Sequence, residues 1–144
     1  MGIRIAKPED WKEISKLLEQ LGYPGTEPFV KDKIGQLLNQ PDEILLVYEK
    51  ESRVVALMSI HFIPQIALAG DFARMSYFIV DRSVRNQGIG KELEEYCCRL
   101  AEDRKCDRIE VHCHARRRMA HRFYFRQGFE ESPKYLIKMI KPGR

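Results

Sequence analysis

The sequence has no hydrophobic run long enough to cross a membrane. Its 144 residues contain no uninterrupted apolar stretch of about 18 residues, the minimum for a helix that spans a bilayer. The first ten residues, MGIRIAKPED, show no basic segment followed by an apolar core, so we expect no secretory signal. Gly2 does not begin a myristoylation motif, because Ala6 stands where that motif needs Ser or Thr. These absences predict a cytoplasmic protein without a membrane partner.

Cysteine is scarce, and its spacing fits neither a disulfide framework nor a zinc finger. No Cys-x-x-Cys pair occurs, so we expect reduced thiols at Cys97, Cys98, Cys106 and Cys113. The triplet 112–114, His-Cys-His, could suggest a metal site, but on a strand its two histidines point to one side and its cysteine to the other. Two ligands do not complete a tetrahedral site, and no second pair has metal-ligand spacing. We therefore expect no metal.

The sequence also lacks internal repeats and any linker rich in Pro, Gly or Ser. Its length fits one domain over residues 1–144, at a prior of ~100–200 residues per domain. Hydrophobic spacing alternates between the periods of strands and helices. The expected strands are Ile3–Lys7, Ile44–Glu49, Val54–Ile63, Phe72–Val80, Asp107–Cys113 and Tyr135–Ile140, and the expected helices cover 8–21, 27–39, 88–105 and 119–127. The order β-α-α-β-β-β-α-β-α-β predicts an α/β (α+β) domain on one mixed sheet.

Basic and acidic residues are nearly balanced over the whole chain, but the small basic excess is unevenly distributed along it. Lys and Arg number 25 against 21 Asp and Glu, a net charge of +4. Residues 82–126 hold 12 basic and 7 acidic residues, so this stretch contains the whole positive excess. A local basic region favours an anionic partner: phosphate, nucleic acid or an acidic surface.

The most informative segment is 77–91, with the sequence YFIVDRSVRNQGIGK. An apolar strand ends at Val80, a polar turn with two glycines follows, and a helix begins directly after it. A helix start leaves about four backbone N–H groups unpaired and favours an anion, and glycine lets the backbone approach that anion. The residues therefore predict a phosphate cradle over 85–91. Gly-Lys-Ser/Thr is absent and Leu93 replaces a third glycine, which excludes a P-loop and a dinucleotide fingerprint.

A second segment, AHRFYFRQGF at 120–129, follows the next strand. Together the two segments resemble the GNAT family of N-acetyltransferases. The acyl-CoA loop of that family, Gln/Arg-x-x-Gly-x-Gly/Ala, is matched by residues 85–90. Its later motif, Ala-x-x-x-Tyr-x-x-x-Gly-Phe, is matched by Ala120, Tyr124, Gly128 and Phe129. The resemblance covers essentially the whole chain, and residues 117–124 further resemble small-amine members such as aminoalkylphosphonate N-acetyltransferases.

The resemblance implies acetyl-CoA as the co-substrate. Backbone groups of residues 78–80 would hold the acetyl carbonyl and the pantetheine arm, and the amides of 87–91 with the Arg85 side chain would bind the pyrophosphate. The expected coenzyme-binding residues are Phe78, Ile79, Val80, Arg85, Asn86, Gln87, Gly88, Ile89, Gly90, Lys91, Arg117 and Phe123. Arg117 replaces an Asn that is frequent in the family. The candidate acceptor-pocket residues are Tyr23, Glu27, Phe29 and Tyr77, with Tyr135 as a further one.

The resemblance also makes Tyr124 the candidate general acid. A phenol can protonate the departing sulfur, because a thiol has a pKa near ~8.5. The same residue also fits the core stripe of a short helix. The general base stays open, because Tyr77 stands where many family members carry a Glu. The candidates for it are His61, His112, His114, Glu27 and Asp71.

We expect an enzyme that moves an acetyl group from acetyl-CoA to a primary amine of a small molecule by direct attack. Two alternatives stay open: acetylation of a protein N-terminus or lysine, and an acyl-CoA-binding regulatory module without catalysis. The five arginines of 116–126, with aromatic residues between them, could stack on nucleic acid bases. A solvated face that contacts the coenzyme 3′-phosphate is the competing interpretation, and we expect no nucleic-acid partner. The resemblance is also compatible with a homodimer.

Overall fold

The computed structural model describes residues 2–112, 117–131 and 136–140. The chain divides into two compact units, Met1–Val111 and His112–Arg144, each of which is described by itself. Within the described residues, no helix is both long enough and apolar enough to cross a bilayer.

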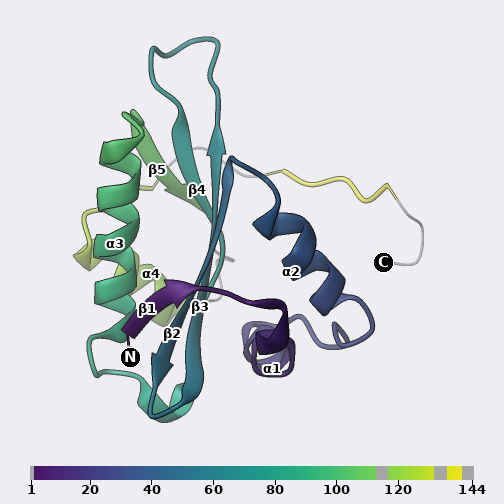
Figure 1. The fold of residues 1–144 in the computed structure, drawn as a ribbon. Coiled ribbons are helices and arrows are strands. Elements are labelled where there is room, and N and C mark those ends of the chain that lie inside the picture. Colours follow the sequence, from purple (N-terminus) through teal and green to yellow (C-terminus); the bar gives the residue numbers. More distant parts are fainter. Residues whose placement is uncertain (1, 113–116, 132–135, 141–144) are drawn as a thin grey trace. The chain divides into compact units, whose positions relative to one another are not determined.

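A mixed five-stranded sheet forms the first unit (Figure 1). Its strands are β1 (Gly2–Ile5), β2 (Glu43–Lys50), β3 (Arg53–Ile63), β4 (Phe72–Val80) and β5 (Arg108–Val111), which lie in that order across the sheet. Neighbouring strands are antiparallel, except for the parallel pair of β4 and β5. A parallel pair needs a crossover connection, which α3 (Ile89–Asp103) supplies. The mixed sheet confirms the fold class that the sequence predicts.

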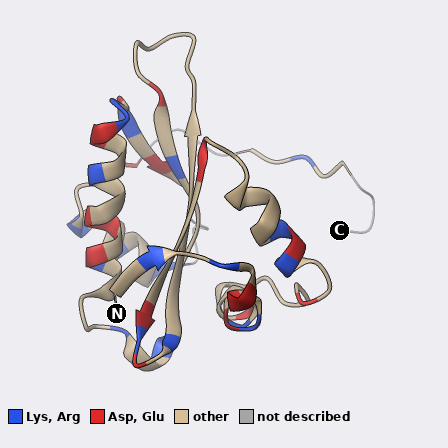
Figure 2. Ribbon diagram, in the orientation of Figure 1, with Lys and Arg blue, Asp and Glu red and all other residues tan. Residues whose placement is uncertain are grey.

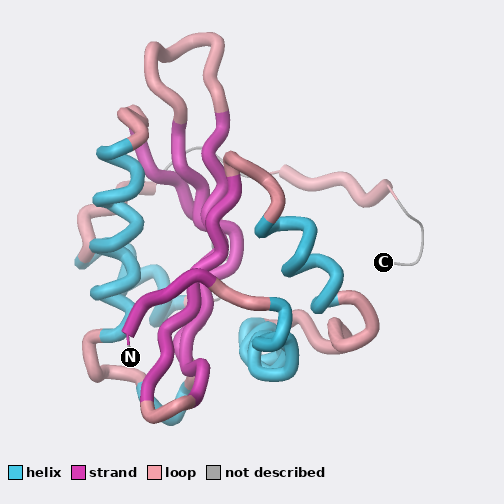
Figure 3. The backbone as a smooth tube through the Cα atoms, viewed as in Figure 1, coloured by secondary structure: helices cyan, strands magenta, loops and turns pink. Residues whose placement is uncertain are grey.

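Helices cover both faces of this sheet (Figures 1 and 3). The short helix η1 (Pro8–Asp10), α1 (Trp11–Leu21) and α2 (Val30–Leu38) precede β2 in the chain, and α1 and α2 lie on one face while α3 lies on the other. On the first face the buried core includes Ile14, Leu17, Val30, Ile34, Leu45, Val47, Leu57 and Ile79. On the other face α3 buries Leu93 and Cys97. These side chains follow the helical and strand spacing of the sequence.

The predicted helix over 27–39 begins three residues late. The backbone N–H groups of Phe29 and Val30 both donate to the Thr26 carbonyl, at 3.0 and 2.9 Å, which makes residues 27–29 a turn before α2. The buried Thr26 hydroxyl lies 2.6 Å from the Ser15 hydroxyl of α1. This contact holds the turn against α1, and residues 27–29 therefore do not continue the helical pattern that begins at Val30.

One ion-pair network joins the start of α1 to the edge of the sheet. The Arg4 guanidinium on β1 donates to both carboxylate oxygens of the buried Asp10, each at 2.9 Å, and its Nε donates to Glu49 of β2 at 2.7 Å. The Lys7 backbone N–H also donates to Asp10, at 2.8 Å. Burial alone would raise the pKa of the Asp10 carboxyl, but the Arg4 and Lys7 hydrogen bonds together bring it below its ordinary value.

The sheet opens along β4. The register pairs β4 with β5 only from Phe72 to Met75, whereas β3 accompanies β4 as far as Val80. Ser59 pairs with Tyr77 and Ile60 with Met75, so Ser76 is an extra residue, a β-bulge. Bulges bend a strand and increase its twist. The bulge therefore coincides with the point where β4 leaves β5.

In the second unit, α4 (Arg118–Arg126) lies within one residue of the predicted helix over 119–127. The predicted final strand, Tyr135–Ile140, is wrong for residues 136–140, which have no strand conformation (Figure 3). Leu136 and Ile140 are 85% and 86% exposed. A strand needs a neighbour to pair its backbone groups, and no register in the described part of the chain includes residues 136–140. Tyr135 lies outside the described residues, as does Cys113 of the predicted strand over 107–113, which ends at Val111.

The Arg4–Asp10 pair predicts acid-sensitive stability. Because the folded pKa of Asp10 is lowered, its contribution is complete above the unfolded pKa of ~3.9 and is lost as the pH falls through the folded pKa. We expect Asp10→Asn to lower the free energy of unfolding at pH 7 by about 1.5–3 kcal/mol and to make it less dependent on pH below 5. Urea denaturation at several pH values measures both effects. The exposed control Glu95→Gln should change stability by no more than about 0.5 kcal/mol, and an equal loss in both variants would contradict the prediction.

Candidate active site

The last residues of β4 present backbone groups to the open side of the strand. The Asp81 N–H donates to the Val55 carbonyl of β3 at 2.8 Å, and the Arg85 Nε donates to the Val80 carbonyl at 3.1 Å. Because successive residues of a strand alternate in direction, the backbone groups of Phe78 and Val80 point away from β3. The predicted acetyl-binding residues thus lie where β4 has already left β5.

A short helix connects β4 to α3. It is η2 (Arg82–Val84), and the Asp81 carboxylate caps it by accepting from the Ser83 N–H at 2.9 Å and the Ser83 hydroxyl at 2.8 Å. The Ser83 amide is the main reason that the pKa of Asp81 lies below its ordinary value. The Gln20 carboxamide of α1 also donates to Asp81, at 3.3 Å, and accepts from the Arg82 N–H at 3.1 Å. The connection is therefore fixed from two sides.

The start of α3 has the geometry of an anion cradle. Asn86 and Gly88 both have positive φ, 66° and 83°, and Gly88 is the N-cap. The first helical hydrogen bond runs from the Glu92 N–H to the Gly88 carbonyl at 3.0 Å, so the amides of residues 89–91 have no acceptor within the helix. A Cβ at Gly88 would have no atom within 4 Å, so the space before the helix is open. These amides lie in the segment for which the sequence predicts a phosphate cradle, and that role stays a prediction.

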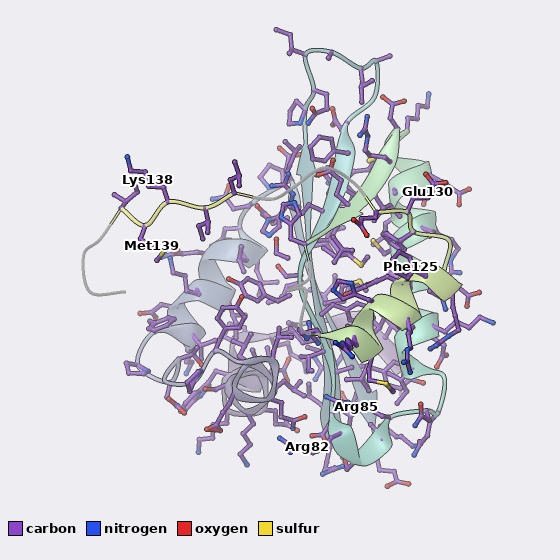
Figure 4. The ribbon with its side chains drawn as sticks, turned by 180° about the vertical axis from the view of Figure 1, so that it is seen from behind. Arg82, Arg85, Phe125, Glu130, Lys138 and Met139 are labelled. Carbon is purple, nitrogen blue, oxygen red and sulfur yellow. The ribbon has the colours of Figure 1, made fainter. Side chains whose placement is uncertain are left out.

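Two basic side chains stand beside this cradle. Arg85, whose side chain Figure 4 labels together with Arg82, is exposed in the connection, and Lys91 is exposed in the first turn of α3. Two residues of β2 contact the same turn: the Lys50 ammonium donates to the Gln87 carboxamide, and the Tyr48 hydroxyl donates to Glu92 at 2.9 Å. Sequence reasoning missed Lys50, Tyr48 and Gln20, because each belongs to an element far from the motif.

The structure brings together two of the four predicted acceptor residues. The rings of Tyr23, after α1, and Tyr77 of β4 meet edge to face with their centroids 5.3 Å apart. Both rings are partly exposed, at 51% and 38%. Glu27 instead lines a shallow depression with Trp11, Pro28, Lys31 and Asp32. Phe29 is exposed at the N-cap of α2, and among the residues that the structure describes no contact places it or Glu27 beside the tyrosine pair.

A row of four ionisable side chains crosses the sheet near Tyr77, and sequence reasoning identified only one of them, His61, as a candidate. Glu43, His61, Arg74 and Glu110 are register partners on β2, β3, β4 and β5. The His61 Nδ1 contacts the Glu43 carboxylate, and Arg74 donates to Glu110 at 3.1 Å. Only the register shows this row, because the four residues lie far apart in the sequence.

In the second unit, Tyr124 is buried in the last turn of α4. The Phe129 N–H donates to the Tyr124 carbonyl at 3.0 Å and the Gly128 N–H to the Phe125 carbonyl at 3.1 Å, with Gly128 at φ 93°. This is the Schellman motif, which is usually completed by an apolar contact between these ends. Here the rings of Tyr124 and Phe129 supply that contact, 5.4 Å apart. Phe123, a predicted coenzyme contact, also meets the Tyr124 ring, and Arg117 is the N-cap of α4.

Neither thiols nor metal ligands form a second centre in the residues that the structure describes. Burial raises the pKa of the Cys97 thiol to about 12 and that of Cys98 to about 11, so both are protonated at neutral pH. No group of three His, Cys, Asp or Glu side chains suited to a metal ion occurs among the described residues. His114 lies outside them.

Comparison with protein families identifies the fold. The family model described as "Acetyltransferase (GNAT) family" matches residues 10–129, most of the chain. The chain belongs to the GNAT family. No curated protein is similar enough in sequence to count as a match.

Solved structures of GNAT-like fold agree over nearly the whole length of the chain. A transcriptional regulator from Bacillus halodurans C-125 has a TM-score of 0.86 at 22% identity, covering 96% of this chain and 98% of that one. Glucosamine-6-phosphate N-acetyltransferase from Arabidopsis thaliana has a TM-score of 0.84 at 19% identity, covering 96% of this chain and 97% of that one. Ribosomal-protein-alanine N-acetyltransferase from Brucella melitensis biovar Abortus 2308 has a TM-score of 0.75 at 16% identity, covering 95% of this chain and 98% of that one. At these identities the likeness shows the shared fold.

GNAT enzymes use acetyl-CoA as co-substrate, and this chain has features that fit it. The amides of residues 89–91, the left-handed Gly88 and the open space in front of it suit a diphosphate. The backbone of Phe78 and Val80, directed away from β3, suits the amides of the pantetheine arm, as an added strand would. As a GNAT acetyltransferase, the chain is an acetyl-CoA-dependent enzyme.

The positive φ of Gly88 predicts opposite outcomes for two Gly→Ala substitutions. Gly88→Ala forces alanine into the left-handed region and should destabilise the fold by about 1–2 kcal/mol. Gly35→Ala lies in the interior of α2 with ordinary helical φ and no atom within 4 Å of the new Cβ, so it should stabilise by about 0.5–1 kcal/mol. Urea denaturation gives both values. If Gly88→Ala stabilised the protein as much as Gly35→Ala does, the turn before α3 would tolerate a negative φ.

Proposed function

We propose that this chain transfers the acetyl group of acetyl-CoA to a primary amine of a small molecule. The observation that carries the proposal is the continuity of the two coenzyme features in one segment. Phe78 and Val80 direct backbone groups away from β3, and nine residues after Val80 the amides of 89–91 begin α3. One extended coenzyme, with amides in its arm and a diphosphate at its end, can use both features at once.

Acetyl-CoA supplies an acetyl thioester, and the residues of the chain orient it. In the proposed reaction the amine nitrogen forms a bond to the acetyl carbon, the carbon–sulfur bond breaks, and the sulfur leaves with the bonding electron pair. During the attack the carbonyl oxygen becomes negative, and backbone N–H groups at the end of β4 can stabilise it. The nitrogen loses a proton to a base or to water, and the departing sulfur gains one.

Tyr124 is the residue that we propose as the proton donor to sulfur. It is the tyrosine of the family motif, and its ring is buried and held between Phe123 and Phe129. An ordinary phenol, with a pKa of ~10, carries its proton at neutral pH. Its hydroxyl can therefore donate that proton to a departing thiolate as the carbon–sulfur bond breaks.

Two other functions have some support. The structural likeness to a ribosomal-protein-alanine acetyltransferase fits a protein acceptor, and the likeness to a transcriptional regulator fits a regulatory module. The likeness to a glucosamine-6-phosphate acetyltransferase fits the small-molecule acceptor. Thiol release from acetyl-CoA across a panel of small amines and peptides separates the three. Release with small amines supports the proposal, release with peptides alone favours a protein acceptor, and tight coenzyme binding without release favours a regulatory module.

Arg85→Glu should weaken CoA binding by about tenfold or more, because it places a negative charge beside the diphosphate and loses a charge-assisted contact. Lys12→Glu, an equal change of charge on exposed α1, is the control and should leave the dissociation constant within twofold. Isothermal titration with CoA measures both. Equal weakening by the two variants would show that only the overall charge of the protein matters.

Tyr124→Phe keeps the ring and removes only the hydroxyl. If Tyr124 is the general acid, the rate of thiol release at saturating substrates should fall by about 10²–10⁴-fold, while the dissociation constant for CoA stays unchanged. The control Phe125→Tyr alters an exposed ring on the same helix and should keep normal turnover. Retained turnover in Tyr124→Phe with normal coenzyme binding would exclude the acid role.

A further inference from the structure

The charged row of Glu43, His61, Arg74 and Glu110 lies on the sheet face of the tyrosine pair. On β3, Leu57 faces the core under α1 and α2, and Ser59 and His61 follow at two-residue intervals on the same face. Tyr77 is the register partner of Ser59, and Arg74 is the partner of His61. The row is therefore the next one along the sheet from Tyr77, about 7 Å away at ~3.3 Å per residue.

This part of the sheet is not fully covered. The four side chains are between 23% and 33% exposed, whereas the rows beneath α1 and α2 are almost completely buried. Sheet faces in a layered α/β domain are normally apolar and covered. Because these ionisable groups are partly exposed on the sheet face beside Tyr77, a polar ligand can reach them.

Arg74 is held in place but has hydrogen-bonding capacity left. Its guanidinium lies over the Phe72 ring, 5.4 Å from the centroid, and one Nη donates to Glu110 at 3.1 Å. Its Nε is buried and has no hydrogen-bond partner among the described residues. A guanidinium has five N–H donors in a fixed planar fork. The guanidinium is therefore oriented in advance, and because the side chain is 33% exposed, its outer N–H groups can be reached by an oxygen ligand.

The order of charges across the row favours an anion at its centre. The carboxylates stand at the two ends, Glu43 on β2 and Glu110 on β5, and each already has a basic partner. Arg108 also lies 4.0 Å from Glu110. The two central strands carry His61, whose imidazole can donate a hydrogen bond, and Arg74, whose guanidinium only donates them. A ligand that lies over β3 and β4 beside Tyr77 meets these two donors first.

We propose that Arg74 binds an anionic oxygen group, such as a carboxylate, of the acceptor molecule. The acceptor class is then a small amine that also carries a negatively charged oxygen group. This proposal rests on the proposed function, because it assigns the specificity of the same transfer. Arg74 acts on the choice of acceptor and not on the chemistry at the acetyl carbon.

Three five-carbon acceptors with similar amines test the proposal: 5-aminopentanoate, pentylamine and 1,5-diaminopentane. Their far ends are negative, neutral and positive, and thiol release from acetyl-CoA gives kcat/KM for each. We expect 5-aminopentanoate to exceed pentylamine by about tenfold or more, and 1,5-diaminopentane to be the poorest. Arg74→Met should bring the ratio of the first two near one, Arg74→Lys should restore part of it, and the control Arg99→Met on exposed α3 should preserve it.

A ratio measured within one variant does not depend on how much of the protein is folded. Equal rates for the three amines in the wild-type protein, or a preference for the dicationic one, would overturn the proposal even if Arg74→Met does not fold. An unchanged ratio in a folded Arg74→Met would overturn it as well. If no amine or peptide causes thiol release, the proposed function itself fails, which is a different result.

Discussion

The two edges of β4 are paired to different extents, and the rest of the active-site region depends on that difference. One edge is paired with β3 along the whole strand, which makes β4 rigid. The other is paired with β5 only as far as Met75, one residue before the bulge at Ser76. If β5 continued along β4 beyond Met75, it would occupy the side of β4 toward which the backbone groups of Phe78 and Val80 point. The early end of this pairing is therefore what makes an extended ligand with amide groups structurally compatible with the fold.

Local placement of charge matters more here than the net charge of the chain. Residues 82–112 contain 7 basic and 7 acidic residues, so the excess of the wider basic stretch comes from the five arginines of 116–126. Figure 2 shows both signs of charge along α3. Since exposed charges are screened over about 8 Å at physiological salt, the cradle before α3 depends on its own amides, Arg85 and Lys91. In the same way, the charged row on the sheet has carboxylates at both ends, but its permanent cation, Arg74, lies on a central strand.

The parts of the fold that the sequence predicts well are those decided by neighbouring residues. The apolar run of β4 and the glycine-containing turn after it are local, and β4 has the predicted bounds of Phe72–Val80. The charged row depends on strand register, and the hairpin turn at Glu51 and Ser52, both at positive φ, sets the register of β2 against β3 without the usual Asn-Gly signal. Residues 136–140 have the apolar spacing of a strand, but spacing cannot supply the neighbour that a strand needs. Glu27 and Phe29 were expected in the helix over 27–39, but they lie in the turn before α2, so helical spacing could not determine where their side chains lie.

The tyrosine motif shows why a family pattern and a catalytic role are separate conclusions. Tyr124, Gly128 and Phe129 occupy the positions C3, C′ and C″ of a Schellman motif, in which glycine adopts the left-handed conformation and the two aromatic rings close the helix end. The spacing of the motif would thus be favoured for folding alone. Every feature of the Schellman motif, however, is satisfied by the ring and the backbone of Tyr124, and none uses the hydroxyl. Phenylalanine would serve the helix end equally well, so the Schellman motif by itself accounts for the aromatic ring and not for the hydroxyl.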